Sequence, residues 1–576
     1  MPQPVAIMTS QVNALQADRP VAVALYFIAG VLLFLSYGYT EMAGSDMWWH
    51  VAAGRELLQT GTVWMVDDWS YSAHGRDWLN HEWLSDIIYY AWVSLWGIES
   101  LVYWKWLVIV ATFSLLQWVL TRYSGSALAG LVCALIAAAI AAPFLDVRPH
   151  LYSLLCFVLL LALLLDRESR TWVLALLFLV WVNLHGGFFF GLMALGILLF
   201  PWRDLRWETF KPAFVTGVIC VLACLFNPSG IETFFYPLKY AFDDSSPFRQ
   251  LGEWLSPMKA GGIRSPLFYL YMWAPLLMIA WCLPRVRRAV GVSWEGIALT
   301  LLTLAMALTS RRFIPLFAIS LAVMLAPLLG AALRQLRLPR FGLALSLAAV
   351  LYGAWRMLPY PLHSGPAFHY LTAEYSYPVE VMNFVEVNEL SGKVYALYNW
   401  GGYIHWRTDG ALKVFIDGRA DTIYDAATYR HYVGVLTSQP GWLEALEATN
   451  PDYVMWPQIE KGGQQKLQAL LESGRWIPIY RDATGWLLAR SDLPLPDTFK
   501  ETPPGPWRDL AFAKVSAWRG ETEQAIEYAN QVRDVIPWHR GACNVLTEAW
   551  RNAGEPEKAR AVWRDCVSYF PSYLLR

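Results

Sequence analysis

Long apolar runs constrain this chain more than any other feature of its sequence. A helix that crosses a membrane needs about 20 apolar residues, because lipid cannot hydrogen bond to an exposed backbone. Only 16% of the residues are charged, and soluble domains average roughly 25%. The runs that reach or approach the required length are 21–39, 99–120, 125–143, 149–165, 172–200, 213–226, 267–283, 294–309, 313–333 and 341–355. The sequence therefore predicts a polytopic α-helical membrane protein, whose first run is a retained anchor.

The segment 172–200 decides the topology. At about 1.5 Å per residue it is roughly 43 Å long, which is long for one crossing and short for two. Polar and glycine residues, NLHGG at 183–187, interrupt its middle. If the segment forms two short helices, most Lys and Arg of the loops fall on one side, as the positive-inside rule requires of the cytoplasmic side. This favours about eleven spans, with the N-terminus inside and everything after residue 357 outside.

This topology gathers acids, histidines and arginines at the outer face of a membrane domain spanning residues 1–357. Its two long hydrophilic loops, 40–98 and 227–265, both fall outside, and short outer turns add 146–150 and 310–313. The candidate catalytic residues are Asp46, His50, Asp67, Asp68, His81 and Glu82. The candidate substrate-binding residues are Trp48, Trp49, Arg148, His150, His185, Arg311 and Arg312. Each residue also has a simpler interpretation, as a solvated loop residue, a helix cap or an interfacial anchor.

Together these side chains suit transfer from a lipid-linked anionic donor. A carboxylate can act as general base on an acceptor hydroxyl, and arginines can bind a phosphate and stabilise the departing group. Tryptophans at an interface can stack on a sugar. A divalent cation would suit the carboxylates too, but the sequence does not decide whether a metal is needed. The net charge of −1 provides no overall positive electrostatic field that would attract nucleic acid.

Six segments of the chain resemble a bacterial group of GT-C-like membrane proteins. They are SDMWWHVAAGRELLQTG (45–61), WLNHEWL (78–84), NLHGGF (183–188), NPSG (227–230), YNWGGY (398–403) and FIDGRAD (415–421). The wider GT-C superfamily contains glycosyltransferases that use polyprenyl-phosphate sugars and keep an acidic residue in a long first outer loop. Asp46 occupies that place here. The resemblance implies an enzyme of the bacterial inner (plasma) membrane that acts at the outer face.

The chain after the last span changes character. Residues 378–492 contain short β-rich runs at 394–398, 413–417, 453–457, 476–480 and 485–490, and helix-like stretches separate the first four. Such alternation predicts a small α/β domain outside the membrane. Asp417, Arg419 and Asp421 follow a strand end, where α/β proteins often bind ligands, although a buried structural ion pair would explain them equally well.

The tail, residues 507–576, repeats with the period of tetratricopeptide motifs. Gly520 matches Gly554, and Ala525 matches Ala559. We expect helices at about 541–553 and 557–570 in the second repeat, and a surface for a protein partner. The cysteines of that repeat, Cys543 and Cys566, lie at similar heights on the two helices. We favour two packed thiols, with a disulfide as the alternative in an oxidising compartment.

Three functions remain open from the sequence alone. The first is a glycosyltransferase that takes a sugar from a polyprenyl-phosphate-type donor in the membrane lipid. The second is a non-catalytic scaffold for assembly of envelope polysaccharide or glycoprotein, which would work through its helical repeats. The third is a transporter, which is disfavoured because the spans carry almost no ionisable residue at mid-depth.

Overall fold

The computed structural model describes residues 20–38, 46–165, 170–242, 247–274, 276, 290, 294–336, 338–357 and 377–568. The chain divides into two compact units. The first, called the membrane unit here, comprises residues 1–40 and 103–358. The second, called the α/β unit, comprises residues 41–102 and 359–576.

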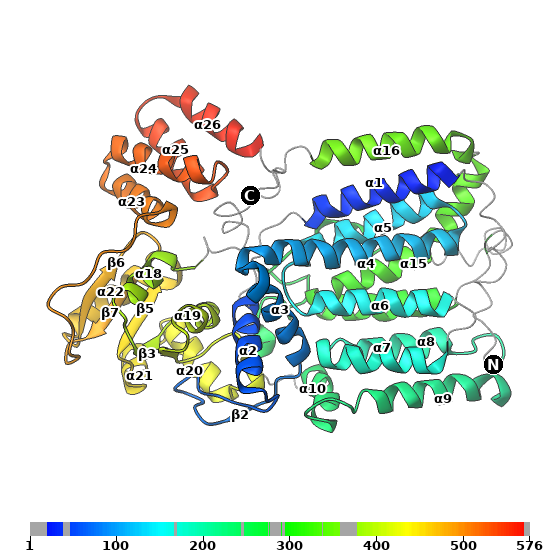
Figure 1. The fold of residues 1–576 in the computed structure, drawn as a ribbon, viewed down its shortest axis with the longest axis horizontal. Helices are drawn as coiled ribbons and strands as arrows, with labels where there is room; N and C mark the ends of the chain where they lie inside the picture. Colours follow the sequence, from blue (N-terminus) through cyan, green and yellow to red (C-terminus); the bar gives the residue numbers. More distant parts are fainter. Residues whose placement is uncertain are drawn as a thin grey trace. The chain divides into compact units, whose positions relative to one another are not determined.

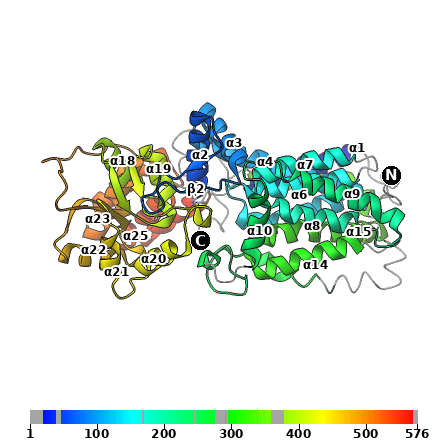
Figure 2. The ribbon, with the colours of Figure 1, turned by 90° about the horizontal axis from the view of Figure 1, so that it is seen from below.

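The membrane unit is built from helices, most of which run side by side in Figures 1 and 2. They are α1 (Pro20–Gly38), α4 (Leu101–Ser124), α5 (Ala127–Ala141), α6 (His150–Leu165), α7 (Thr171–Leu184), α8 (Phe188–Leu199), α9 (Trp207–Ala223), α10 (Ile231–Phe242), α11 (Pro266–Tyr271), α14 (Trp294–Thr309), α15 (Ile314–Gln335) and α16 (Gly342–Met357). Four stretches are long and apolar enough to cross a membrane, namely Pro20–Gly38, Ile98–Ser124, Ala127–Phe144 and Arg311–Gln335. The chain is an integral membrane protein, and its total of spans stays a prediction.

Close helix packing in this unit depends on small residues, as is usual between helices in lipid. Helix α1 packs against α5 and α16, and α15 packs against α5 and α14. A β-carbon added at Gly30 of α1 would lie 2.1 Å from Oε1 of Gln117. The glycine therefore lets the Gln117 side chain approach α1, where its Nε2 donates to the carbonyl of Tyr26 (3.0 Å).

The segment 172–200 forms two helices, as the sequence predicts. Helix α7 ends at Leu184, His185 caps it with an extended backbone, and α8 begins at Phe188. The polar and glycine residues therefore mark a real helix break, although the side of the membrane on which it lies stays a prediction. The expected span at 267–283 lies mostly outside the described residues, which continue only to Ala274 and include residue 276.

A five-stranded mixed sheet forms the centre of the α/β unit. Its strands are β3 (Gly392–Tyr395), β4 (Leu412–Val414), β5 (Tyr453–Pro457), β6 (Trp476–Arg481) and β7 (Gly485–Arg490). The order is β4-β3-β5-β7-β6, with β3, β4 and β5 parallel and β7 antiparallel to both of its neighbours. Every residue of β5 is buried, which its uninterrupted apolar run predicts. All five expected strands are confirmed.

Five helices accompany the strands (Figure 1). They are α18 (Val379–Val387), α19 (Gly401–Thr408), α20 (Ala426–Leu436), α21 (Trp442–Ala448) and α22 (Gly463–Glu472). Helix α19 connects the parallel strands β3 and β4, as a crossover between parallel strands requires. The motif YNWGGY lies at its start, directly after the carboxyl end of β3.

The first long loop belongs to the α/β unit rather than to the spans with which the sequence groups it. It contains α2 (Asp46–Thr60), the hairpin of β1 (Met65–Val66) and β2 (Asp77–Trp78), and α3 (Trp83–Trp96). Ser70 forms a parallel bridge with Val414 at the outer edge of β4. The amide of Val414 donates to the carbonyl of Trp69, and the amide of Tyr71 donates to the carbonyl of Val414, both at 3.0 Å. The loop thus extends the sheet.

The tail consists of two helical hairpins with a shared apolar core. Its helices are α23 (Pro506–Arg519), α24 (Thr522–Val535), α25 (Arg540–Asn552) and α26 (Pro556–Ser568). The last two agree closely with the helices expected in the second repeat. Cys543 and Cys566 form a disulfide, with their Cα atoms 6.4 Å apart. The favoured prediction of two free thiols is therefore wrong, because the antiparallel hairpin brings these positions within bridging distance.

Candidate functional site

Asp46 is the first residue of α2 and lies beside the backbone of Gly418. A β-carbon added at Gly418 would be 3.2 Å from Oδ1 of Asp46 and 3.1 Å from Nε1 of Trp49. A β-carbon added at Gly402 would be 2.9 Å from the β-carbon of Trp49. Two glycines from the motifs FIDGRAD and YNWGGY therefore let α2 lie directly against α19 and against the segment that follows β4. Asp46 itself is only partly buried.

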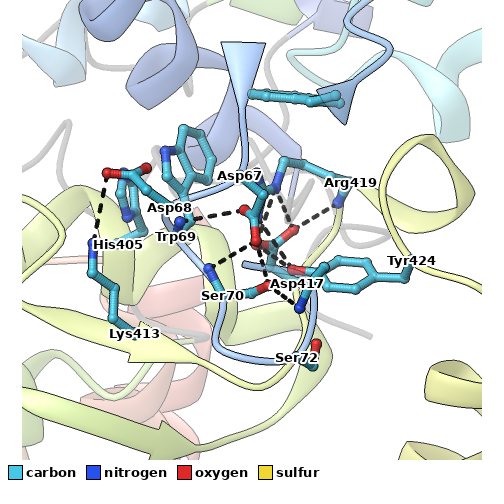
Figure 3. Close-up of polar contacts among 12 residues, drawn as sticks. Asp67, Asp68, Trp69, Ser70, Ser72, His405, Lys413, Asp417, Arg419 and Tyr424 are labelled. Atoms are coloured by element: carbon cyan, nitrogen blue, oxygen red, sulfur yellow. Dashed lines mark hydrogen bonds and ion pairs between the residues drawn. The ribbon is translucent and has the colours of Figure 1, made fainter. Parts of the chain in front are cut away.

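A buried ion network adjoins this contact (Figure 3). The guanidinium of Arg419 donates from Nε and Nη2 to Asp417, at 2.8–3.1 Å, and from Nη2 to Oδ1 of Asp67 at 2.6 Å. The hydroxyl of Tyr424 donates to Asp417 at 2.9 Å. Although burial opposes its charge, the carboxylate of Asp417 holds the pKa of Arg419 well above its usual range. Asp67, Asp417 and Arg419 are all buried.

Aromatic rings complete the surroundings of Arg419. Its guanidinium carbon lies 4.2 Å from the ring centroid of Trp69 and 4.8 Å from that of Trp78. Both tryptophans come from the first loop, as does Asp67. Cation–π contacts of this kind gain strength where the cation is removed from water. The first loop therefore surrounds Arg419, which follows β4, with the carboxylate of Asp67 and the rings of Trp69 and Trp78.

The neighbouring aspartates of the first loop, both candidate catalytic residues, differ in their environments. Asp67 accepts hydrogen bonds from the hydroxyl and amide of Ser70, at 2.6 and 3.3 Å, in addition to its pair with Arg419. Asp68 is 62% exposed and lies 3.7 Å from Lys413. The contacts of Asp67 are those of a buried structural ion pair, and those of Asp68 are typical of a solvated surface pair. We therefore leave both aspartates out of the catalytic group proposed for this protein.

His50 lies between two carboxylates where α2 crosses α3. Its Nδ1 shares a hydrogen bond with Oδ1 of Asp86 (2.5 Å), and its Nε2 is 3.7 Å from Oε2 of Glu82. The second oxygen of Asp86 accepts from Nδ2 of Asn80 at 2.8 Å. His81 lies 3.8 Å from Glu82. Of the candidate catalytic residues, the structure thus brings His50, His81 and Glu82 together.

Sequence reasoning missed Asp86. Its side chain is fully buried, and burial raises its pKa well above the usual range of an aspartate. A signal was available in the spacing, since Glu82 and Asp86 are four residues apart and share one face wherever the segment is helical. A buried carboxylate on His50 fixes the orientation of the imidazole and leaves its other nitrogen toward Glu82.

The far half of α2 is attached to α19 by a second polar cluster. Oε1 of Glu56 accepts from Nε1 of Trp69 at 2.5 Å and shares a hydrogen bond with Nε2 of His405 at 3.1 Å. The ring of His405 stacks on Trp69, with centroids 3.9 Å apart. Burial, assisted by the charge of Arg419, lowers the pKa of His405 to about 3, so this imidazole is neutral. Trp48 adds an edge contact with the ring of Tyr403 in α19.

In the membrane unit, two arginines share one carboxylate. Arg148 donates to Glu253 at 2.5 Å, and Arg312 lies 3.9 Å from the same carboxylate. The guanidinium of Arg312 also covers the ring of Trp254, 4.1 Å from its centroid. Burial alone would raise the pKa of Glu253, but the charges of Arg148 and Arg312 lower it to about 2. All three side chains remain partly exposed, which suits binding of a further anion.

Arg311 differs from its neighbour because it is fully buried. Its guanidinium donates to the backbone carbonyls of Gly252, Lys259 and Gly261. These contacts hold the second long loop and use donors that a phosphate clamp would need. We therefore assign Arg311 a structural role.

The two remaining histidines of the substrate-binding set also have local partners. Nε2 of His150 lies 2.7 Å from the carbonyl of Phe144 and 3.7 Å from Asp146. Nδ1 of His185 shares a hydrogen bond with the hydroxyl of Ser153 (2.7 Å) and accepts from the amide of Gly187 (3.0 Å). Such contacts are those of helix-end residues. Over the described ranges, no group of three or more His, Cys, Asp or Glu side chains is arranged to hold a metal ion.

No family model and no curated protein matches the chain. The solved structure described as ArnT from Cupriavidus metallidurans in the apo state is similar to it, at 14% sequence identity and a TM-score of 0.45. The similarity covers 81% of this chain and 96% of that one.

Proposed function

We propose that this protein is a glycosyltransferase that moves a sugar from a polyprenyl-phosphate-type donor in the membrane to an acceptor at the outer face. The observation that carries the proposal is the position of Asp46. It begins α2 soon after the first span and lies partly exposed against the loop after β4. An acid in this part of the chain is the feature through which the sequence resembles GT-C glycosyltransferases.

In this proposal Asp46 is the general base. Its carboxylate takes the proton of the acceptor hydroxyl as the oxygen attacks the anomeric carbon, and the bond from that carbon to the phosphate oxygen breaks. A positioned base of this kind contributes about 10²–10⁴ in rate. Glu82 and His50, with Asp86 behind them, form a second group that can hold or pass on a proton.

Within the membrane unit, Arg148 and Arg312 are proposed to bind a phosphate group of the lipid donor. Arginine suits this task because its planar group can donate two parallel hydrogen bonds to phosphate oxygens. The carboxylate of Glu253 keeps both guanidinium groups near one another before the donor binds. Trp48 and Trp49 follow Asp46 closely in α2, but both are buried. We therefore do not propose that either ring contacts the sugar.

Photolabelling of the purified full-length protein in lipid nanodiscs tests this function. The probe is a polyprenyl-phosphate sugar that carries a photoreactive group, and the competitor is unlabelled polyprenyl phosphate. We expect saturable labelling that the competitor removes, followed by release of polyprenyl phosphate when an acceptor is added. Saturable labelling without turnover, or no labelling at all, would instead favour the non-catalytic scaffold.

A further inference from the structure

The first loop and the sheet of the α/β unit share a buried ion network of unequal charge. Two carboxylates, Asp67 from the loop and Asp417 from the sheet, face the single guanidinium of Arg419. All three side chains are completely inaccessible. Arg419 is therefore the one cation of this network that separates two buried anions, and its bond to Asp67 is an ionic link between loop and sheet.

This link lies next to the contact that holds Asp46. Gly418, whose backbone meets the carboxylate of Asp46, stands between Asp417 and Arg419 in the chain. Trp69, which covers one face of Arg419, donates to Glu56 of α2 and stacks on His405. Both ends of α2 therefore contact groups that Arg419 holds in place.

We propose that Arg419 is a positioning residue, which fastens the first loop to the sheet through Asp67 and Asp417 and so fixes the helix that carries Asp46. This inference rests on the proposed function, because it assigns the α/β unit a part in the same site. The unit is then a component of the catalytic site, since it sets where the proposed base stands.

The chemistry of the guanidinium explains why arginine occupies this position. Nε and Nη2 of the guanidinium donate to the carboxylate of Asp417, and Nη2 also donates to the carboxylate of Asp67. Its flat faces accommodate the rings of Trp69 and Trp78. A lysine ammonium offers a point charge without the planar fork, so it cannot satisfy both carboxylates and both rings with one geometry.

The most informative variant is Asp67→Asn. It removes the charge that joins the loop to Arg419 but leaves the Asp417–Arg419 pair intact, so no buried charge loses its only partner. Arg419→Lys is the second variant, which keeps the charge and removes the fork. Asp492→Asn is the matched control, because it neutralises another arginine-paired aspartate of the same unit, bonded to Nε of Arg490 at 2.6 Å.

Hydrogen–deuterium exchange of the full-length protein measures how firmly α2 and the first loop are held, and it does not depend on enzymatic activity. In Asp67→Asn, amides of residues 46–60 and 67–78 should exchange about tenfold faster, as loss of a charge-assisted hydrogen bond predicts. Amides of β5 and β7 should keep their protection, and the control should exchange like wild type throughout. Unchanged exchange in α2 for both Asp67→Asn and Arg419→Lys would overturn the positioning role.

Steady-state kinetics with a polyprenyl-phosphate sugar supply the second readout. A misplaced base lowers kcat while the KM for the donor stays near wild type, and Arg419→Lys should retain more activity than Arg419→Met. A variant that loosens α2 yet keeps the wild-type kcat would also overturn the inference. If wild type itself transfers no sugar, the proposed function fails, whereas the exchange experiment still decides whether Arg419 fastens α2.

Discussion

The two long loops of this chain are held by different means. The first, residues 40–98, adds a strand-like segment to the sheet and shares the ion network of Asp67, Asp417 and Arg419. The second, residues 227–265, is held in the membrane unit through backbone carbonyls that accept from Arg311. A fully buried arginine from another segment fastens each loop: Arg419 bonds to the side chain of Asp67, and Arg311 bonds to backbone carbonyls. Partly exposed charged side chains lie nearby and are the ones proposed to act chemically. Adjacent charged residues such as Arg311 and Arg312 look alike in the sequence, but they differ in burial. The fully buried residue has a structural role, and the partly exposed one is proposed to bind substrate.

The largest expected effect tests which aspartate of the first loop acts chemically. Asp46→Asn should lower kcat for sugar transfer by about 10³, because an amide cannot accept the acceptor proton. Exchange protection of α2 should stay at the wild-type level. Asp68→Asn is the comparison within the same loop, and a solvated pair of this kind predicts a change of less than about twofold. Equal losses in the two variants would contradict the distinction.

The next effect concerns the carboxylate behind His50. Asp86 shares a hydrogen bond with His50 through one oxygen and accepts from Asn80 through the other, so Asp86→Asn must turn an amide group toward one of these two partners. The imidazole then loses its orientation, and kcat should fall by about 10². Steady-state rates over a range of pH values provide the measurement.

A control for this variant lies in the same loop. Asp77→Asn changes an exposed aspartate of β2 and should leave the pH profile as it is in wild type. An Asp86→Asn protein with the wild-type rate at every pH would remove the His50 group from the mechanism.

A smaller effect separates the two adjacent arginines of the membrane unit. Arg312→Lys should raise the KM for the lipid donor about tenfold, because lysine cannot form the bidentate pair with phosphate. Arg311→Lys should instead speed hydrogen exchange of residues 252–261, because a lysine lacks the planar guanidinium that donates to the carbonyls of Gly252, Lys259 and Gly261. The reverse assignment of these two phenotypes would show that burial does not separate their roles.

The last expected effect is a pH dependence of the attachment of the first loop. In the folded protein the pKa of His405 is about 3, lowered by burial from its ordinary 6.5. His405 lies in α19 and is covered by Trp69 and Glu56 of the first loop, so it is exposed when the loop detaches. The detached state then binds more protons than the attached one between these pH values, and the free energy that holds the loop falls as the pH decreases below 6.5. At pH 5 the loss is about 2 kcal/mol.

Exchange of residues 46–60 at pH 7 and pH 5, corrected for the intrinsic rate, measures this loss. Amides of the buried strands β5 and β7 serve as the internal reference. Glu56, whose pKa burial raises, acts in the opposite direction nearer its own ordinary value of 4.5. Protection of α2 that does not change between pH 7 and pH 5 would show that His405 does not contribute to the attachment.

The local patterns of the sequence determined much of the fold. The apolar runs located the long membrane helices, and NLHGG marked the break between α7 and α8, because glycine and polar residues interrupt a helix wherever it stands. The five strands and the two helical hairpins of the tail also follow from periodicity and from turn residues. These features depend on neighbours within a few positions in the chain.

Only the tertiary structure decided what the charged residues do. Asp67 pairs with Arg419 across 352 positions of sequence, a partnership that no local spacing reveals. Arg311 and Arg312 are adjacent and chemically identical, yet one is buried among carbonyls and the other partly exposed over a ring. Asp86 and the Cys543–Cys566 disulfide likewise depend on how two helices cross or pair. The reason is physical: an ionisable or thiol group takes its role from burial and from the partner that faces it, and the packing of distant segments sets both.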